Sequence, residues 1–74
     1  MHIERLITMA NDIGNFFSSE PDRREAVTGI ANHIRRYWDP RMRRQIVDYV
    51  QAGNQQGLTE LVHEAIRQLN NQSS

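Results

Sequence analysis

Half of the residues between positions 35 and 44, in the stretch RRYWDPRMRR, are arginines. A guanidinium group is planar and presents parallel N–H donors, so it binds carboxylates and phosphates through paired hydrogen bonds. Arginine, tryptophan and tyrosine are also the side chains that contribute most to protein–protein interfaces. The composition of this stretch therefore indicates an anion-binding or protein-docking surface. We name its five cations the arginine corner: Arg35, Arg36, Arg41, Arg43 and Arg44.

Helix electrostatics explain only part of this positive charge. The whole chain is neutral, with nine arginines, no lysine and nine acidic residues. Arg35 and Arg36 end a predicted helix, where the helix dipole favours positive charge, but the other three open the next helix, where it does not. Local helix stability therefore leaves the second group unexplained. Asp39 and Asp48 can neutralise part of the corner, and Asp48 follows Arg44 at the i, i+4 spacing that favours an ion pair.

The rest of the chain offers little for catalysis or metal binding. It has no cysteine, which excludes thiolate ligands, disulfides and a cysteine nucleophile. The histidines at 2, 33 and 63 are far apart in the sequence and match no metal-binding spacing. The glycines are isolated, so they form no phosphate-binding loop, and Glu60 and Glu64 read as solvated charges at a helix start. We therefore predict no catalytic, cofactor or metal site, and no enzymatic activity for the chain alone.

Three functions are compatible with the arginine corner, beside an ordinary solvated charged face around a core tryptophan. The corner can dock a protein through carboxylates. It can hold an anionic cofactor during delivery to an enzyme, because pyrophosphate and carboxylate recognition use the same guanidinium geometry. It can also bind nucleic acid as a small helix-turn-helix-like protein does, with basic residues at the start of the second helix. A neutral chain without lysine disfavours nucleic acid, since such domains are usually basic.

Four stretches carry apolar residues at the spacing of amphipathic helices, and none shows the sustained alternation of a strand. The first has an apolar stripe that includes Phe16 and Phe17. The sequence thus predicts an all-α fold, a small bundle of about four short helices in one domain over residues 1–69, followed by a disordered polar tail at 70–74. The main variant is a three-helix core with a loosely docked fourth helix. The predicted helices cover about residues 2–17, 22–37, 40–52 and 60–69.

Capping residues mark where the second and third helices begin. Asp22 and Glu25 have the spacing of a capping box, although Ser19 is a competing start. Asp39 is a typical N-cap, because its carboxylate accepts hydrogen bonds from the free amides of a helix start. Pro40 then suits the first helical position.

Other residues indicate where the helices end and what the core contains. Gly53 is expected to end the third helix and Thr59 to cap the fourth. Gly14 lies inside the first helix, where it allows another backbone to approach closely. Met42 is expected in the core. Trp38 can either staple the start of the third helix from within the core or anchor an interface, and the thin core of a 74-residue chain favours the first position.

Nothing in the sequence indicates a membrane or an export signal. No apolar run approaches the ~20 residues that a membrane-spanning helix needs. The first residues, MHIERLITM, carry charges where a signal peptide has an unbroken apolar stretch. We therefore expect a cytoplasmic protein without membrane contact.

Three stretches together resemble the small delta subunit of cytoplasmic NAD-dependent formate dehydrogenase: IERLITMANDIGNFF, PDRREAVTGIANHIRRYWDPRMRRQIV and GLTELVHEAIRQL. The resemblance covers about residues 2–69, and the WDPRMR block is its most specific part. It implies a complex that oxidises formate to carbon dioxide and reduces NAD. In that complex, the large subunit carries a molybdenum or tungsten bis-pterin guanine dinucleotide cofactor and iron–sulfur clusters. Two other subunits carry FMN and a further iron–sulfur cluster.

The resemblance implies that this chain is a non-catalytic accessory subunit without a redox centre. Its expected role is to support assembly, stability or molybdenum-cofactor loading of the large (alpha) subunit. The lack of cysteine agrees with this, because iron–sulfur clusters need thiolate ligands. Asp39 and Pro40 are expected to set the turn, and the arginines from Arg36 onward to face outward. The residues expected to bind the partner are Arg35, Arg36, Trp38, Asp39, Pro40, Arg41, Arg43 and Arg44.

Overall fold

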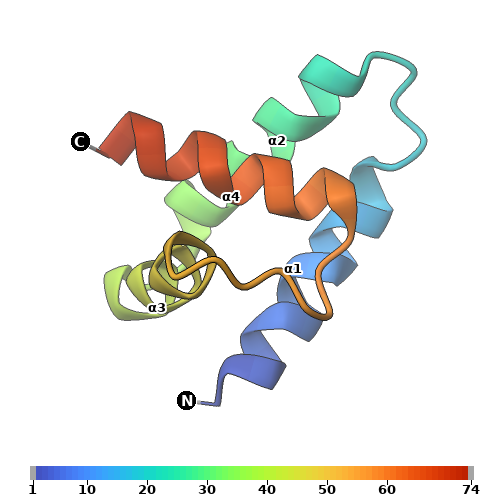
Figure 1. The fold of residues 1–74 in the computed structure, drawn as a ribbon. Helices are drawn as coiled ribbons and strands as arrows, with labels where there is room; N and C mark the ends of the chain where they lie inside the picture. The colour runs from blue at the N-terminus through green and yellow to red at the C-terminus, as the bar shows by residue number, and fades with distance from the viewer. Residues whose placement is uncertain (1, 74) are drawn as a thin grey trace.

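The computed structural model describes residues 2–73, with side chains described from position 2 to position 70. Within that range the chain forms four helices and no strand, which confirms the all-α prediction. Figure 1 shows the four helices packed across one another at steep angles rather than side by side. They are α1 (Ile3–Phe17), α2 (Arg23–Tyr37), α3 (Pro40–Gln51) and α4 (Glu60–Ser73).

The fourth helix is the centre of the fold. α4 crosses α2, its most extensive neighbour, and also packs against α3 and α1 (Figure 1). Its side chains Val62, Ala65, Ile66 and Leu69 are completely buried. The variant with a loosely docked fourth helix is therefore wrong. Small and medium apolar side chains on α4 let the other helices approach it closely, which a thin core requires.

Each of the other helices also contributes completely buried side chains. Leu6 comes from α1, Ile30 and Ile34 come from α2, and Ile46 comes from α3. Met42 packs against this core, as predicted, but it is only partly buried. The core therefore draws on all four helices.

The apolar stripe predicted for α1 is correct for Phe17 and wrong for Phe16. Phe17 is half-buried and its ring packs against Gly29 of α2, where a Cβ would collide with it. Phe16 is 78% exposed. Consecutive helical residues are about 100° apart around the axis, so two adjacent phenylalanines at a helix end do not share one buried face.

The N-caps predicted for α2 and α3 are both present. An oxygen of the Asp22 side chain accepts a hydrogen bond from the Arg24 N–H at 2.9 Å, which places the start of α2 at Asp22 and not at Ser19. The Asp39 side chain accepts one from the Arg41 N–H at 2.8 Å. Local side-chain chemistry therefore sets where these helices begin.

The predicted capping box at Asp22 does not form. The carboxylate of Asp22 bonds to the N–H of Arg24 and not to that of Glu25. The N–H of Asp22 donates to the side chain of Glu20 at 3.4 Å, so the reciprocal half of the box is also absent within the described residues. A carboxylate that precedes the cap satisfies the same donor, which makes the reach back from Glu25 unnecessary.

The connection between α3 and α4 also follows the sequence prediction. Gly53 has a φ of 92°, a left-handed conformation that favours glycine. It comes directly after Ala52, the C-cap of α3, which ends at Gln51. The hydroxyl of Thr59 accepts a hydrogen bond from the Val62 N–H at 3.3 Å, so Thr59 caps α4 as predicted.

Gly14 and Asn11 fasten α1 to the start of α4. Gly14 is buried, and a Cβ there would overlap a methyl group of Val62, so the close approach at this glycine is made by a side chain and not by the predicted backbone. One turn earlier, the side-chain amide of Asn11 donates to the carbonyl of Gly57 at 2.8 Å. Its oxygen accepts from the N–H of Thr59 at 3.3 Å.

α4 continues beyond its last apolar residue, Leu69, and ends at Ser73. The sequence predicts a disordered tail at 70–74, but Asn70 lies within α4 and its side-chain oxygen accepts a hydrogen bond from the side chain of Gln51 at 3.1 Å. The side chains of residues 71–73 and the whole of Ser74 lie outside the described residues, so the rest of the predicted tail stays a prediction.

Candidate functional site

The arginine corner is built on the sharp junction between α2 and α3. Only Trp38 and Asp39 separate the two helices. Trp38 is 7% exposed and lies in the core, which is the position that the sequence favours. Its backbone N–H donates to the carbonyl of Ile34 at 3.0 Å. Asp39 caps α3, and Pro40 occupies the first turn, where a missing N–H costs no hydrogen bond. The junction is thus fixed both to the core and to the next helix.

Four of the five guanidinium groups lie on side chains that face solvent. Arg35 and Arg36 end α2, and Arg41 and Arg44 belong to the start of α3. Arg35 donates from Nη2 to the side-chain oxygen of Asn32 at 3.0 Å, which leaves its other donors accessible. The outward orientation predicted for Arg36, Arg41 and Arg44 is therefore correct.

Arg43 differs from the other arginines of the corner. Its side chain is half-buried, and its Nη1 donates to the backbone carbonyl of Arg35 at 3.0 Å. That carbonyl belongs to the last turn of α2, where helical carbonyls lack partners within the helix. The prediction that Arg43 faces outward is therefore wrong. Arg43 instead holds the start of α3 against the end of α2.

Among the described residues, no carboxylate forms an ion pair with the corner. Among the described residues one ion pair forms, between Nε of Arg23 and Oε2 of Glu64 at 3.2 Å, and neither belongs to the corner. The predicted pair between Asp48 and Arg44 is absent, which is expected where both groups remain hydrated and a surface pair gains little. The described chain thus leaves the guanidinium groups of the corner without an acidic partner.

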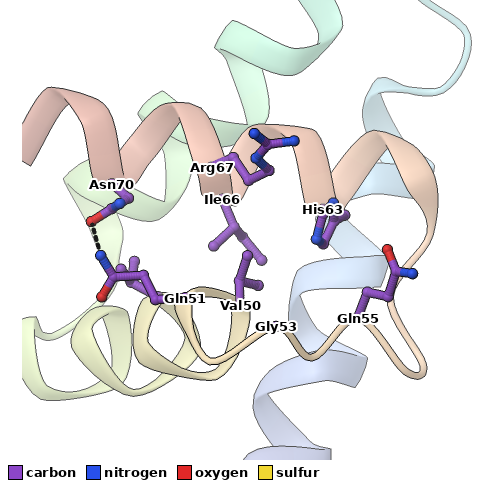
Figure 2. A pocket seen from close by; sticks show the side chains of 9 residues that line it. Val50, Gln51, Gly53, Gln55, His63, Ile66, Arg67 and Asn70 are labelled. Atoms are coloured by element: carbon purple, nitrogen blue, oxygen red, sulfur yellow. Dashed lines mark hydrogen bonds between the residues drawn. The ribbon is translucent and has the colours of Figure 1, made fainter.

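A groove lies between α4 and the C-terminal half of α3, away from the N-cap of α3. Figure 2 shows Val50 and Ile66 facing each other across this groove, with a hydrogen bond from Gln51 to Asn70 closing one end. His63 also lines it. Beside His63, the lining offers Arg67, amides and apolar side chains but no carboxylate that could pair with the imidazole. The sequence contains no motif that would have indicated this groove.

The structure also separates the residues that most often bind metals. His2 precedes α1, His33 lies in α2, and His63 lies in α4. Within the part of the chain that the structure describes, no three side chains of histidine, cysteine, aspartate or glutamate gather as a metal site would require. None of the helices in that part is long and apolar enough to cross a bilayer.

Sequence reasoning missed an aromatic surface that adjoins the corner. Tyr37, which directly precedes Trp38, is 68% exposed, and its ring packs on that of His33 with centroids 4.8 Å apart. Phe16 is exposed on the neighbouring helix α1. The i, i+4 spacing of the two aromatic rings on α2 is the signal that could have indicated a shared face.

One comparison with known proteins finds a match that spans most of the chain. The family described as NADH-dependent formate dehydrogenase delta subunit FdsD matches residues 5–66 of the 74-residue chain. No curated protein and no solved structure matches the chain. The matched range includes the whole arginine corner and the capped junction that supports it. The chain therefore belongs to the family of NADH-dependent formate dehydrogenase delta subunits.

Proposed function

We propose that the chain is a non-catalytic accessory subunit of a cytoplasmic NAD-dependent formate dehydrogenase and docks on the large (alpha) subunit through the arginine corner. Through this contact it supports assembly, stability or molybdenum-cofactor loading of that subunit. The single observation that carries the proposal is the cluster of guanidinium groups at a rigid junction with no carboxylate partner among the described residues. Membership of the delta-subunit family supplies the complex in which the partner is sought.

Holding these positive charges close together costs free energy. Like charges on adjacent turns repel, and those at the start of α3 also oppose the helix dipole. An acidic surface on a partner removes both penalties at once. Guanidinium groups lose less hydration than ammonium groups on burial and bind carboxylates with two hydrogen bonds, which suits an interface built from arginine without lysine.

The fixed backbone of the junction strengthens this argument. Trp38 is packed in the core beneath it, and Asp39 and Pro40 set the first turn of α3. A docking surface on a rigid support loses less conformational entropy when it binds than one on a mobile loop. Of the residues expected to bind the partner, these three and Arg43 support the surface, whereas the exposed arginines supply its contacts.

The proposal assigns the redox cofactors to the partner subunits. The chain has no cysteine to hold an iron–sulfur cluster, and we propose that the bis-pterin molybdenum or tungsten cofactor, the iron–sulfur clusters and FMN all reside in the other subunits. Enzymatic activity then belongs to the complex. The contribution of the delta subunit is measured as the yield, stability or cofactor content of the large subunit.

The test replaces three exposed arginines of the corner, Arg36, Arg41 and Arg44, with alanine and leaves the structural Arg43 in place. The matched control makes the same change of charge at exposed arginines outside the corner: Arg5, Arg24 and Arg67. Co-purification with the large subunit is measured from cells that produce the whole complex. We expect the corner variant to lose association and the control variant to keep it.

Two results would contradict the proposal. Equal co-purification of the folded corner variant and the wild type would remove this surface from the interface. Retention of random duplex DNA by the wild-type chain, weakening steeply with salt and lost in the corner variant, would assign the corner to phosphate binding instead.

A further inference from the structure

Two large hydrophobic side chains are exposed outside the core. Phe16 is 78% exposed and Tyr37 is 68% exposed. Phe16 stands edge-on to the ring of Phe17, with centroids 5.2 Å apart and planes at 85°. Tyr37 packs on His33 in a tilted arrangement. Scattered single apolar residues are normal on a protein surface, so the question is whether these two belong to one surface.

A shallow hollow lies between Phe16 and His33, the residue on which the ring of Tyr37 packs. Ile13, Phe16 and Phe17 of α1 line it from one side and His33 of α2 lines it from the other. His33 therefore borders the hollow and also carries the ring of Tyr37. The exposed rings form a continuous surface across α1 and α2, which we name the aromatic strip: Phe16, His33 and Tyr37.

The two tyrosines of the chain differ in whether their hydroxyl groups are paired within the fold. The hydroxyl of Tyr49 donates to the carbonyl of Gln56 at 2.9 Å and helps to close the loop after α3. The hydroxyl of Tyr37 has no hydrogen-bond partner within the described residues, and its ring contacts another partly exposed ring. A tyrosine with both its ring and its hydroxyl available is well suited to contact a second protein.

The aromatic strip continues directly into the arginine corner. Arg36 and Tyr37 follow His33 on α2 by three and four residues, so each is a neighbour of His33 on the helix surface. Asn32, Arg35 and Arg36 line a hollow of their own on the same helix. An occupant of the hollow beside His33 therefore lies next to Arg36, and Arg36 borders the second hollow with Arg35.

Size and charge restrict the kind of occupant. Exposed aromatic side chains bury at most about 250 Å² each, whereas a stable interface covers roughly 800 Å² per partner, so the strip must act together with the surface beside it. That surface carries Arg35 and Arg36 at one end and Asp12 at the other. Because its net charge is positive, two copies of the chain would bring two cationic surfaces together, whereas an acidic partner would complement it.

We propose that the aromatic strip and the arginine corner form one docking surface for an acidic segment of the large subunit. The segment inserts an apolar side chain into the hollow between Phe16 and His33 and places carboxylates against Arg35 and Arg36. This inference rests on the proposed function, because that function supplies the partner. It adds an apolar anchor and a third helix, α1, to an interface that otherwise consists of charges on α2 and α3.

The test replaces Phe16 and Tyr37 together with glutamine, which is compatible with a helix. Both side chains are exposed, so circular dichroism and the thermal midpoint should match the wild type. Binding is measured by biolayer interferometry between the full chain and formate dehydrogenase prepared without its delta subunit. We expect the affinity to fall at least about tenfold, as removal of interface hot spots does. The control Tyr37→Phe keeps the ring and should bind within about threefold of the wild type.

The corner variant, measured in the same assay, distinguishes the two proposals. Normal binding by the glutamine variant with lost binding by the corner variant would overturn the aromatic strip and leave the proposed function in place. Normal binding by both would overturn both. Concentration-dependent self-association of the wild type that the glutamine variant abolishes, with unchanged binding to the enzyme, would assign the strip to a second copy and overturn the proposal.

A second measurement remains decisive if the glutamine variant fails to fold. A benzoylphenylalanine in place of Phe16 preserves the aromatic ring and forms a covalent bond with its neighbours under ultraviolet light. In the purified complex it should crosslink to an acidic segment of the large subunit, whereas the same group in place of the exposed Gln55 should not. Absence of a crosslink from position 16, or one to a segment without carboxylates, would overturn the inference.

Discussion

The two ends of α3 differ in how far their polar groups are paired within the described chain. At its C-terminal end, the connection to α4 satisfies its groups within the chain: Tyr49 bonds to Gln56, and Asn11 bonds to both Gly57 and Thr59. At its N-terminal end, the arginine corner carries guanidinium groups that have no carboxylate partner in the described structure. Both ends are turns of the same helix, so the difference lies in whether their polar side chains are paired within the described residues.

The difference predicts how each end of α3 responds to a binding partner. A partner that binds the C-terminal connection must first break hydrogen bonds that already exist, so the net gain is small. A partner that brings carboxylates to the arginine corner forms new charged hydrogen bonds without breaking an ion pair. Hydrogen bonds that are satisfied inside the chain should therefore affect stability when removed, and the open guanidinium groups should affect association.

The largest expected effect tests whether the support beneath the corner is structural. Replacement of the buried Trp38 with alanine should lower the free energy of unfolding by about 3–5 kcal/mol, because it leaves a cavity in a thin core. A domain of 74 residues has a total stability of only about 4–11 kcal/mol, so this variant should lose a large share of its stability. Urea denaturation followed by circular dichroism measures the change.

The adjacent Tyr37 provides the control for this prediction. Tyr37→Ala removes an aromatic ring of similar size from the surface and should change the stability by less than about 1 kcal/mol. If Trp38→Ala and Tyr37→Ala lowered the free energy of unfolding by comparable amounts, burial would not distinguish the two rings.

A smaller effect is expected at the C-terminal connection. Asn11→Ala removes both the hydrogen bond to the Gly57 carbonyl and the one from the Thr59 N–H, and it should destabilise the protein by about 1–2 kcal/mol. Asn32→Ala is the matched change at the corner. It removes only a contact with the exposed Arg35 and should alter stability by less than about 0.5 kcal/mol. Chemical denaturation of both variants checks the contrast, and equal losses would contradict it.

The smallest expected effect separates two arginines that are adjacent in the sequence. Arg43→Ala should cost about 0.5–1.5 kcal/mol, because the Arg35 carbonyl loses its donor. Arg44→Ala should leave stability unchanged within about 0.5 kcal/mol, since its side chain is exposed. In the binding assay we expect the opposite order, with Arg44→Ala the more harmful. If Arg43→Ala and Arg44→Ala lower stability equally and weaken binding equally, the structural role assigned to Arg43 is incorrect.

Features that depend on a few neighbouring residues were predictable from the sequence. The caps at Asp22, Asp39 and Thr59 and the positive φ at Gly53 all follow from chemistry within one turn. The position of Trp38 also follows, because an aromatic residue before an N-cap packs back on the helix that it precedes.

Features that depend on residues distant in the sequence were not predictable. The outward position of Phe16 depends on Phe17 taking the site beside Gly29 of another helix. The bond from Arg43 to the Arg35 carbonyl depends on the angle between α2 and α3. One local prediction was also wrong: the Asp48–Arg44 pair was predicted from spacing within one helix turn, and spacing does not include the competition with water.

The sequence by itself determined the four helices, their caps and the grouping of five arginines at one junction, because helix periodicity, capping and chain proximity are local. The tertiary structure decided that α4 is central, that one arginine is structural and that an exposed aromatic strip continues the corner onto α1. These outcomes depend on which helix faces come together. Packing selects those faces by the total apolar area that all four helices bury at once, a quantity that no single segment contains.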